Sequence, residues 1–318
     1  MTTKAKQHDI FDMVGTVYAY TAMALIICII AFIITVCAKD GYKVLSFEFL
    51  TAPPNASARA SDFQEESGGI LTPLVGTVIL TVMGIGIAFP FSLGTAIYLC
   101  FYAKKGVFRT LVKTAVDILA GVPTVVIGLF ALVIFTMPQM GFLSTLIEGV
   151  EGANRAFGRS FLVAGITMAI MVLPFVIKSM EEALKSVPSS YIDAAYALGA
   201  SKWRTIYKVA LNSARSGLMT GVILGMGRII GDTAIVWLAL GGSIRMSGPK
   251  PWYMPGNWLA ILRGSGSTLT SYIFYASPAG EGNKYDVAFG ASLVLIVIII
   301  VLNIVVSVVG KVGAQGHE

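Results

Sequence analysis

Long apolar runs alternate with shorter polar segments along the whole sequence. Six runs, each near or above the roughly 20 apolar residues that carry an α-helix across a bilayer, lie at residues 14–36, 71–102, 111–135, 161–180, 217–240 and 287–309. The pattern predicts an all-α, polytopic membrane protein with six transmembrane helices. Pro90, Pro123 and Pro174 lie inside predicted spans and predict breaks or kinks there.

The composition indicates that the bilayer is the solvent for most of the chain. Hydrophobic residues make up 56% of the 318 residues and charged residues 13%, about half the charged share of a typical soluble domain. The net charge of +6 lies in short connections between apolar runs, which favours a membrane protein over a nucleic-acid-binding one. The cysteines, Cys28, Cys37 and Cys100, lack the spacing of a metal site, so we expect no disulfide, no metal and no cofactor.

Lysine and arginine residues are distributed unevenly among the predicted connections. The N-terminal tail carries Lys4 and Lys6, and the second connection carries four basic residues at 104–113 without an acid. The fourth connection carries six at 178–215, whereas the first has more acids than bases. Because positive residues favour the cytoplasmic side, both termini are predicted to be cytoplasmic, with the first helix retained as the insertion signal.

The fourth connection has the pattern of two short helices joined by a bend. Ser189 or Ser190 is a candidate N-cap for the first helix, with Asp193 in its first turn, where the helix dipole favours an anion. Gly199 is a candidate C-cap, and a second helix is predicted at 202–209. A rigid, bent segment fits a contact that transmits force to a partner, and an ordinary interfacial amphipathic helix fits the same residues equally well.

This connection resembles the EAA loop of ABC importer permeases. The family pattern is EAA-x3-G-x9-I-x-LP, and the residues that match it in spacing are Asp193, Ala194, Ala195, Gly199, Val209 and Leu211. Asp193 replaces the usual glutamate and keeps its charge, and Asn212 replaces the usual proline. In the family, the loop sits in a cleft of the ATPase subunit. The resemblance therefore implies that Asp193, Ala194, Ala195, Gly199 and Leu211 couple this chain to an ATPase.

Further segments are similar to the A-type permease of Pst phosphate importers. They lie within residues 68–234 and read GGILTPLVGTVILT, FPFSLGTAIYL, LAGVPTVVIGLF and GRIIGDTA. Thr124 stands where the family's GVPS-type motif has serine, and Asp232 stands where its GETA motif has glutamate. The resemblance implies a MetI-like ABC permease fold, and a permease subunit of a phosphate importer in the bacterial inner membrane that works by alternating access.

The predicted spans divide the chain, and the resemblance, of which the first 65 residues carry little, implies its partners. Residues 1–68 form a tail, the first helix and an extracytoplasmic loop; residues 69–312 form the permease domain, with a coupling loop at about 181–213; residues 313–318 form a C-terminal tail. Six helices make half a pathway, so a second, homologous permease is expected, with two ATPase subunits, an extracytoplasmic phosphate-binding protein and membrane lipid. The sequence has no G-x4-G-K-[ST], so the chain is predicted not to be an enzyme and to leave ATP hydrolysis to its partner.

Arg228 and Asp232 are charged residues inside the fifth predicted span. Because a charge at bilayer depth costs at least about 2.5–3.5 kcal/mol, such residues normally pair or line a pathway. Their i, i+4 spacing places both on one face of a continuous helix, where the arginine fork suits phosphate oxygens and the carboxylate moderates their binding. The predicted substrate pathway comprises Arg228, Asp232 and, through its hydroxyl, Thr233; a buried ion pair that only fixes helix packing remains open. Asp117 is expected to cap its helix or to pair with Lys113.

Three other functions fit parts of the pattern. A permease for another oxyanion, such as sulfate or molybdate, lacks the support of the GRIIGDTA segment. A secondary transporter or channel is expected to show internal repeats with paired broken helices, and no convincing repeat is present. A membrane-embedded enzyme needs clustered reactive side chains, and the only histidines, His8 and His317, lie in the tails.

Overall fold

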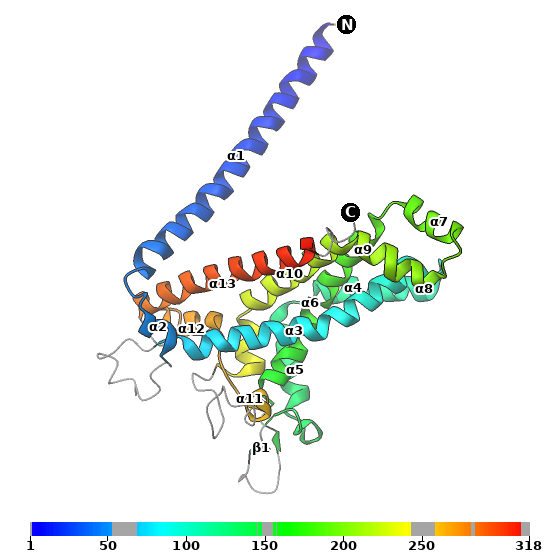
Figure 1. Ribbon diagram of the computed structural model, residues 1–318. Helices are drawn as coiled ribbons and strands as arrows, with labels where there is room; N and C mark the ends of the chain where they lie inside the picture. Colours follow the sequence, from blue (N-terminus) through cyan, green and yellow to red (C-terminus); the bar gives the residue numbers. More distant parts are fainter. Residues whose placement is uncertain are drawn as a thin grey trace.

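The computed structural model describes residues 2–52, 69–144, 146–147, 155–156, 158–242, 258–280 and 284–312 (Figure 1). The predicted C-terminal tail at 313–318 and much of the predicted extracytoplasmic loop, 53–68, lie outside these ranges. Two short antiparallel strands, β1 (Leu146–Ile147) and β2 (Arg155–Ala156), are the only strands in the described part. Its regular structure is otherwise helical, so the predicted all-α class is confirmed.

The long helices follow the order of the predicted spans. They are α1 (Thr2–Gly41), α3 (Leu71–Ile97), α4 (Val107–Gly121), α5 (Thr124–Phe135), α6 (Phe161–Lys185), α10 (Arg215–Gly231) and α13 (Tyr285–Val312). Short elements connect them: α2 (Phe47–Thr51), η2 (Pro138–Met140), α7 (Ser189–Ala197), α8 (Lys202–Thr205), α9 (Leu211–Ser213), α11 (Trp258–Arg263) and α12 (Leu269–Ala276). The described residues also include three π-helical turns: η1 (Tyr98–Tyr102), η3 (Ile206–Ala210) and η4 (Val236–Leu240).

Four helices of the described residues are long and apolar enough to cross a membrane, or up to five spans if a bent pair counts as one. They are Met13–Gly41, Leu71–Tyr102, Phe161–Lys185 and Tyr285–Val308, and the bent pair is α4 with α5. The count of six spans therefore stays a prediction.

Two predicted spans are not single helices. The third is divided at Val122 and Pro123, where α4 and α5 meet at 100°. Proline lacks an N–H and forces the residue before it out of the helical region, and Val122 has φ −73° and ψ 127°. The fifth is interrupted after Gly231, because Asp232 adopts an extended backbone with ψ 124°. Pro90 and Pro174, in contrast, lie inside helices that continue through them.

Helices α3, α6 and α10 form the centre of the packed structure (Figure 1). Helix α6 is the most enclosed of the candidate spans, with 67% of its apolar window buried. Small residues allow the close approach: a Cβ added to Gly84 of α3 would lie 2.8 Å from Cδ1 of Ile229 in α10. The buried side chains of α6 are therefore packed against α3 and α10.

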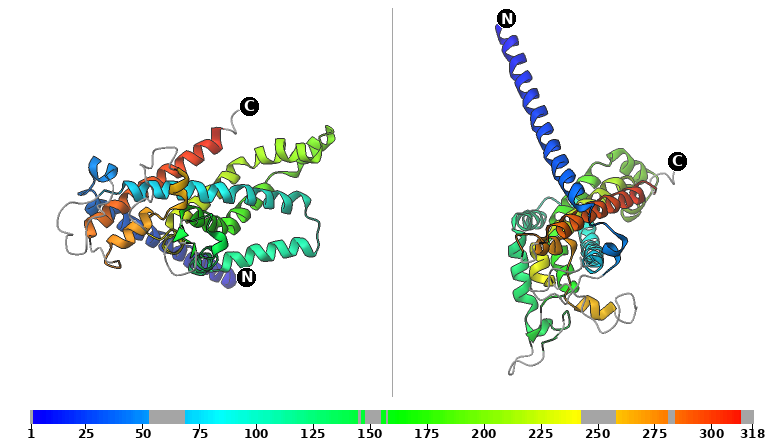
Figure 2. Two further views of the ribbon diagram at one scale, coloured as in Figure 1. Left: turned by 90° about the horizontal axis from the view of Figure 1, so that it is seen from below. Right: turned by 90° about the vertical axis from the view of Figure 1, so that its left-hand side faces the viewer.

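Helix α1 stands apart from this centre. It contacts α13 near its C-terminal end and then extends away from the other helices (Figures 1 and 2). None of its apolar window is buried by the rest of the chain. A surface this apolar requires lipid or another membrane protein around it.

Candidate functional site

Arg228 lies in the last turn of α10 and contacts α6 through its guanidinium. The Nε atom donates a hydrogen bond to Sδ of Met171 at 3.0 Å, and Cζ lies 3.9 Å from the centroid of the Phe175 ring. Met171 is only 1% exposed, and Phe175 is half-buried. The arginine side chain itself is exposed. The α6 contacts thus fix the guanidinium, while the side chain remains exposed.

The prediction that Arg228 and Asp232 share one face of a continuous helix is wrong. Helix α10 ends at Gly231, so the two residues do not share a helical face. Asp232 instead accepts a hydrogen bond from the backbone N–H of Ile235 through Oδ1 at 2.8 Å, and so caps the next helical turn. No ion pair joins Arg228 to a carboxylate within the described ranges. The packing-pair alternative fails for the same reason.

The break after α10 brings Asp232 and Thr233 to a half-buried position at the start of η4. The Thr233 carbonyl accepts a hydrogen bond from the Trp237 N–H at 3.0 Å, which fixes the turn. Glycine followed by aspartate is a common stop-and-cap signal. Gly231–Asp232 is such a signal in the sequence, but it lies inside an apolar run that predicted an unbroken helix.

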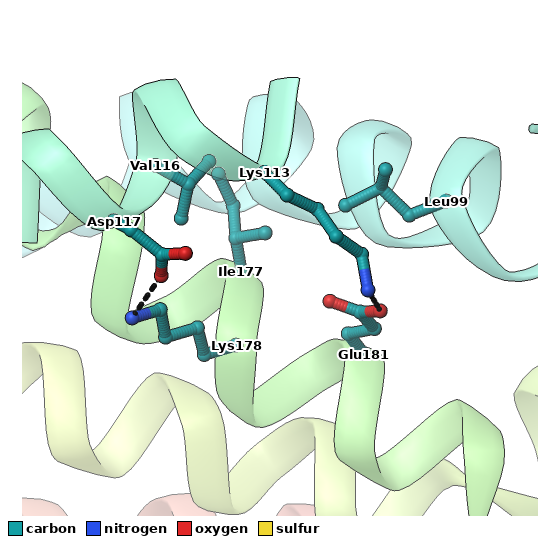
Figure 3. A pocket seen from close by; sticks show the side chains of 7 residues that line it. All are labelled: Leu99, Lys113, Val116, Asp117, Ile177, Lys178 and Glu181. Atoms are coloured by element: carbon teal, nitrogen blue, oxygen red, sulfur yellow. Dashed lines mark ion pairs between the residues drawn. The ribbon is translucent and has the colours of Figure 1, made fainter. Parts of the chain in front are cut away.

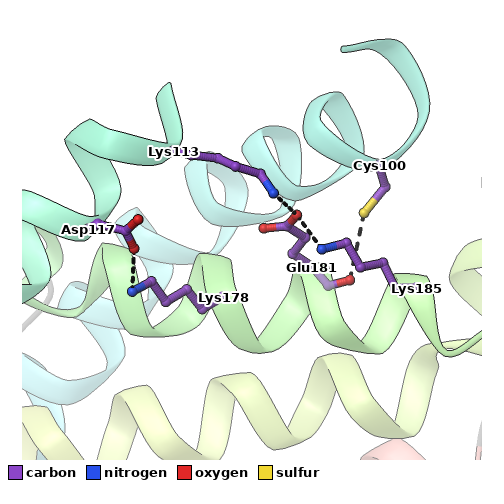
Figure 4. Close-up of polar contacts among 6 residues, drawn as sticks. All are labelled: Cys100, Lys113, Asp117, Lys178, Glu181 and Lys185. Carbon is purple, nitrogen blue, oxygen red and sulfur yellow. Dashed lines mark hydrogen bonds and ion pairs between the residues drawn. The ribbon is translucent and has the colours of Figure 1, made fainter. Parts of the chain in front are cut away.

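A second group of charges joins α4 to α6, and Figure 3 shows the pocket that it surrounds. Nζ of Lys178 lies 2.6 Å from Oδ1 of Asp117, and Nζ of Lys113 lies 3.1 Å from Oε1 of Glu181. Lys185 reaches the same Glu181 oxygen at 2.7 Å (Figure 4). The pocket holds about 120 Å³ and is completed by Leu99, Val116 and Ile177.

The expected pairing of Asp117 with Lys113, or a capping role, is therefore not what the structure has. Both side chains point from α4 toward α6, where Asp117 pairs with Lys178 and Lys113 pairs with Glu181 (Figure 3). Glu181 had no predicted role, although the charges on both helices recur at three- and four-residue intervals, which indicates facing charged stripes. The group fixes α4 to the end of α6.

Glu181→Gln should lower the thermal stability of the protein in detergent by about 2 kcal/mol, because two lysines then lose their shared carboxylate. The loss stays below that of a fully buried pair, since Lys113 and Lys185 reach solvent. Asp117→Asn is the matched control: its side chain is 63% exposed, against 10% for Glu181, and a change within about 1 kcal/mol is expected. Equal losses in the two variants would contradict this ranking.

The segment from Ser189 to Ser213, here called the hook, comprises α7, α8, η3 and α9. It lies at the far end of α3 and α6 from α2 and α12 (Figure 1). Gly199 has φ +76° and turns the chain between α7 and α8, as predicted from its C-cap pattern. The backbone N–H of Ala200 reaches back to the carbonyl of Ala195 at 3.0 Å and closes the turn.

The start of the hook differs from the prediction. Pro188 occupies the N-cap position and Ser189 is already helical, so neither Ser189 nor Ser190 caps α7. Asp193 consequently falls beyond the first turn. The second predicted helix is α8 continued by the π-turn η3, and its cap is Ser201, whose hydroxyl accepts the Arg204 N–H at 3.4 Å.

The hook presents one face outward and is attached by the other. Asp193 and Ala194 are exposed, whereas Ala195 is buried and Leu211 packs against the hydrophobic core. Lys202 places its ammonium 4.3 Å from the ring centroid of Tyr102, the last residue of η1. Five large side chains of the hook are exposed: Tyr191, Tyr196, Leu198, Trp203 and Tyr207. Exposed aromatic and apolar side chains in this number suit a protein partner.

Residues 86–315, which include both Arg228 and the hook, match the family described as binding-protein-dependent transport system inner membrane component. The phosphate transport system permease protein PstC of Xylella fastidiosa strain Temecula1 is 33% identical over 207 residues, covering 62% of this chain and 63% of that protein. The phosphate transport system permease protein PstA of Mycobacterium leprae is 29% identical over 292 residues, covering 92% of this chain and 86% of that protein.

Solved ABC transporters share the fold. A bacterial ABC transporter that imports the acidic polysaccharide alginate has a chain that superimposes with a TM-score of 0.58 and 17% identity, covering 95% of this chain and 98% of its own. The MetNI methionine ABC transporter, in an inward-facing conformation, gives 0.56 at 17% identity, covering 76% and 94%. The MetI-like permease fold predicted from the sequence is confirmed.

Proposed function

The chain belongs to the family of binding-protein-dependent transport system inner membrane components, and on that premise we propose that it is the permease subunit of an ATP-driven importer of inorganic phosphate. One observation carries the proposal. Helix α6 contacts the unneutralised cation Arg228 and leads directly into the hook. A membrane helix that joins an anion-attracting group to a protein-docking segment fits a driven transporter of anions.

Phosphate is the substrate that the chemistry and the relatives together favour. An arginine fork binds tetrahedral oxyanions with directed hydrogen bonds and keeps its charge at any relevant pH. Asp232 and Thr233, at the break after α10, supply an acceptor and a hydroxyl that can meet a protonated phosphate. Sulfate and molybdate carry no such proton at neutral pH, so an acceptor disfavours them.

The partners follow from surfaces that this chain leaves uncovered. The apolar α1 and the exposed side of Arg228 support a second, homologous permease that completes the pathway. The hook, with Asp193, Ala194 and Gly199 exposed on it, supports docking to one of two ATPase subunits, which perform all ATP chemistry. An extracytoplasmic phosphate-binding protein supplies the ion. Lys202, Arg204 and Lys208 lie in the hook itself, which favours placing that end and both chain termini in the cytoplasm.

The test is radiolabelled phosphate uptake into proteoliposomes that contain both permeases, the ATPase and the binding protein. Uptake should require ATP and every subunit, and a tenfold excess of sulfate or molybdate should leave it nearly unchanged. Phosphate movement by this chain alone would identify a secondary transporter or channel instead. Strong competition by sulfate would identify a permease for another oxyanion.

A further inference from the structure

We propose that Phe175 and Met171 are positioning residues that hold the Arg228 guanidinium through uncharged contacts, so that its full positive charge stays available to a phosphate ion. The inference rests on the proposed function and names the groups that make its site selective. It concerns how the cation is held, which the comparisons leave open.

The first step is geometric. Met171 and Phe175 are four residues apart on α6, so both face α10. The ring covers one face of the guanidinium at 3.9 Å, and the sulfur accepts from Nε at 3.0 Å. These two contacts fix the plane and the rotation of the fork and direct its outer edge away from α6. The terminal nitrogens have no acceptor among the described residues.

The second step is electrostatic. Lys113, Lys178 and Lys185 each lie within 3.1 Å of a carboxylate oxygen, whereas Arg228 has an aromatic face and a thioether sulfur instead. A carboxylate partner would neutralise the charge and compete with an incoming anion for the same donors. An aromatic face attracts the cation without neutralising it, and a thioether sulfur is a weak acceptor. Arg228 is therefore oriented and still electrostatically unsatisfied.

The third step concerns access. Gly227 and Gly231 flank the arginine, and a Cβ added to either would meet no described atom within 4 Å apart from its chain neighbours and its own helix backbone. The side chain of Arg228 is itself exposed. The fork thus faces space that the described residues leave open, and a tetrahedral oxyanion with one or two negative charges fits its free donors.

The experiment measures phosphate moved per ATP hydrolysed by the complete complex in proteoliposomes. Phe175→Leu should lower this ratio about fivefold, the upper end of what is expected for losing a cation–π contact to an exposed cation, with ATP hydrolysis retained. Met171→Leu, which keeps the volume and removes the sulfur acceptor, should lower it about threefold. Phe175→Tyr keeps the aromatic face and should restore the ratio to within about twofold of the parent.

Phe135→Leu in α5 is the matched control, since Phe135 is, like Phe175, a half-buried phenylalanine, it packs against the hydrophobic cluster that contains Met171, and it makes no recorded contact with Arg228 among the described residues. A purely structural role for Phe175 would lower transport and hydrolysis together, as any loss of folded complex does. If Phe175→Leu does not assemble, Met171→Leu decides, and an unchanged ratio in that variant overturns the inference. Normal transport by Arg228→Gln would overturn the proposed site itself, whereas a silent Phe175→Leu beside an inactive Arg228→Gln would overturn only the positioning role.

Discussion

We expect Arg228→Gln to abolish ATP-driven phosphate uptake, with a loss on the order of a hundredfold or more, while the complex still assembles. Glutamine retains hydrogen-bond donors but carries no charge, so the anion meets no cation on this face of α10. The Met171 and Phe175 contacts contribute little to folding, because the arginine side chain is exposed. Uptake of radiolabelled phosphate and recovery of the intact complex by size-exclusion chromatography measure the two parts separately.

Arg228→Lys separates charge from shape. A lysine keeps the positive charge and loses the planar fork, so we expect uptake between that of the parent and that of the glutamine variant. Uptake by Arg228→Gln equal to the parent would exclude Arg228 from the pathway. Complete loss of assembly in both variants would show that the residue serves packing instead.

Gly199→Val should reduce capture of the ATPase subunits about tenfold or more. Gly199 has φ +76°, a conformation that costs an L-residue about 1–2 kcal/mol and a β-branched one more. The strain is relieved by straightening the turn between α7 and α8, which redirects the outer face of the hook. The measurement is the amount of ATPase that co-purifies with tagged permease.

Ala197→Val is the matched control for this change. Ala197 is also exposed and lies in α7 with helical geometry, so the added methyl groups meet a backbone that tolerates them. Full ATPase recovery with Gly199→Val would contradict a role for the bent hook in docking. Loss with both variants would assign the effect to bulk on the docking face instead of to the turn.

The sequence predicted the class of the fold and the long helices because hydrophobic length is a strong signal. The second predicted span, 71–102, matches the observed Leu71–Tyr102. The spans at 111–135 and 217–240 were wrong as single helices, since hydropathy is blind to a backbone break inside an apolar run. Pro123 marked the first break, and the Gly231–Asp232 pair marked the second.

In the candidate site, too, some features were predicted from the sequence and others were not. The turn at Gly199 was predicted correctly, because a positive φ leaves a residue-type signature. The contacts of Arg228 were not, because Met171 and Phe175 belong to another helix, and nothing local marks an aromatic ring or a thioether as the partner of a distant cation. Glu181 had no predicted role for a related reason: its partner Lys113 is close only once α4 and α6 pack.

Helix α6 contacts Arg228 near its middle and continues without interruption to Lys185. Its 25 residues span about 37 Å at 1.5 Å per residue. If α6 tilts by about 10° about the point beside the guanidinium, each end of the helix moves by about 3 Å and its midpoint stays almost in place. A small movement of the hook would therefore reorient Met171 and Phe175 around Arg228 without moving the bound ion along the membrane normal.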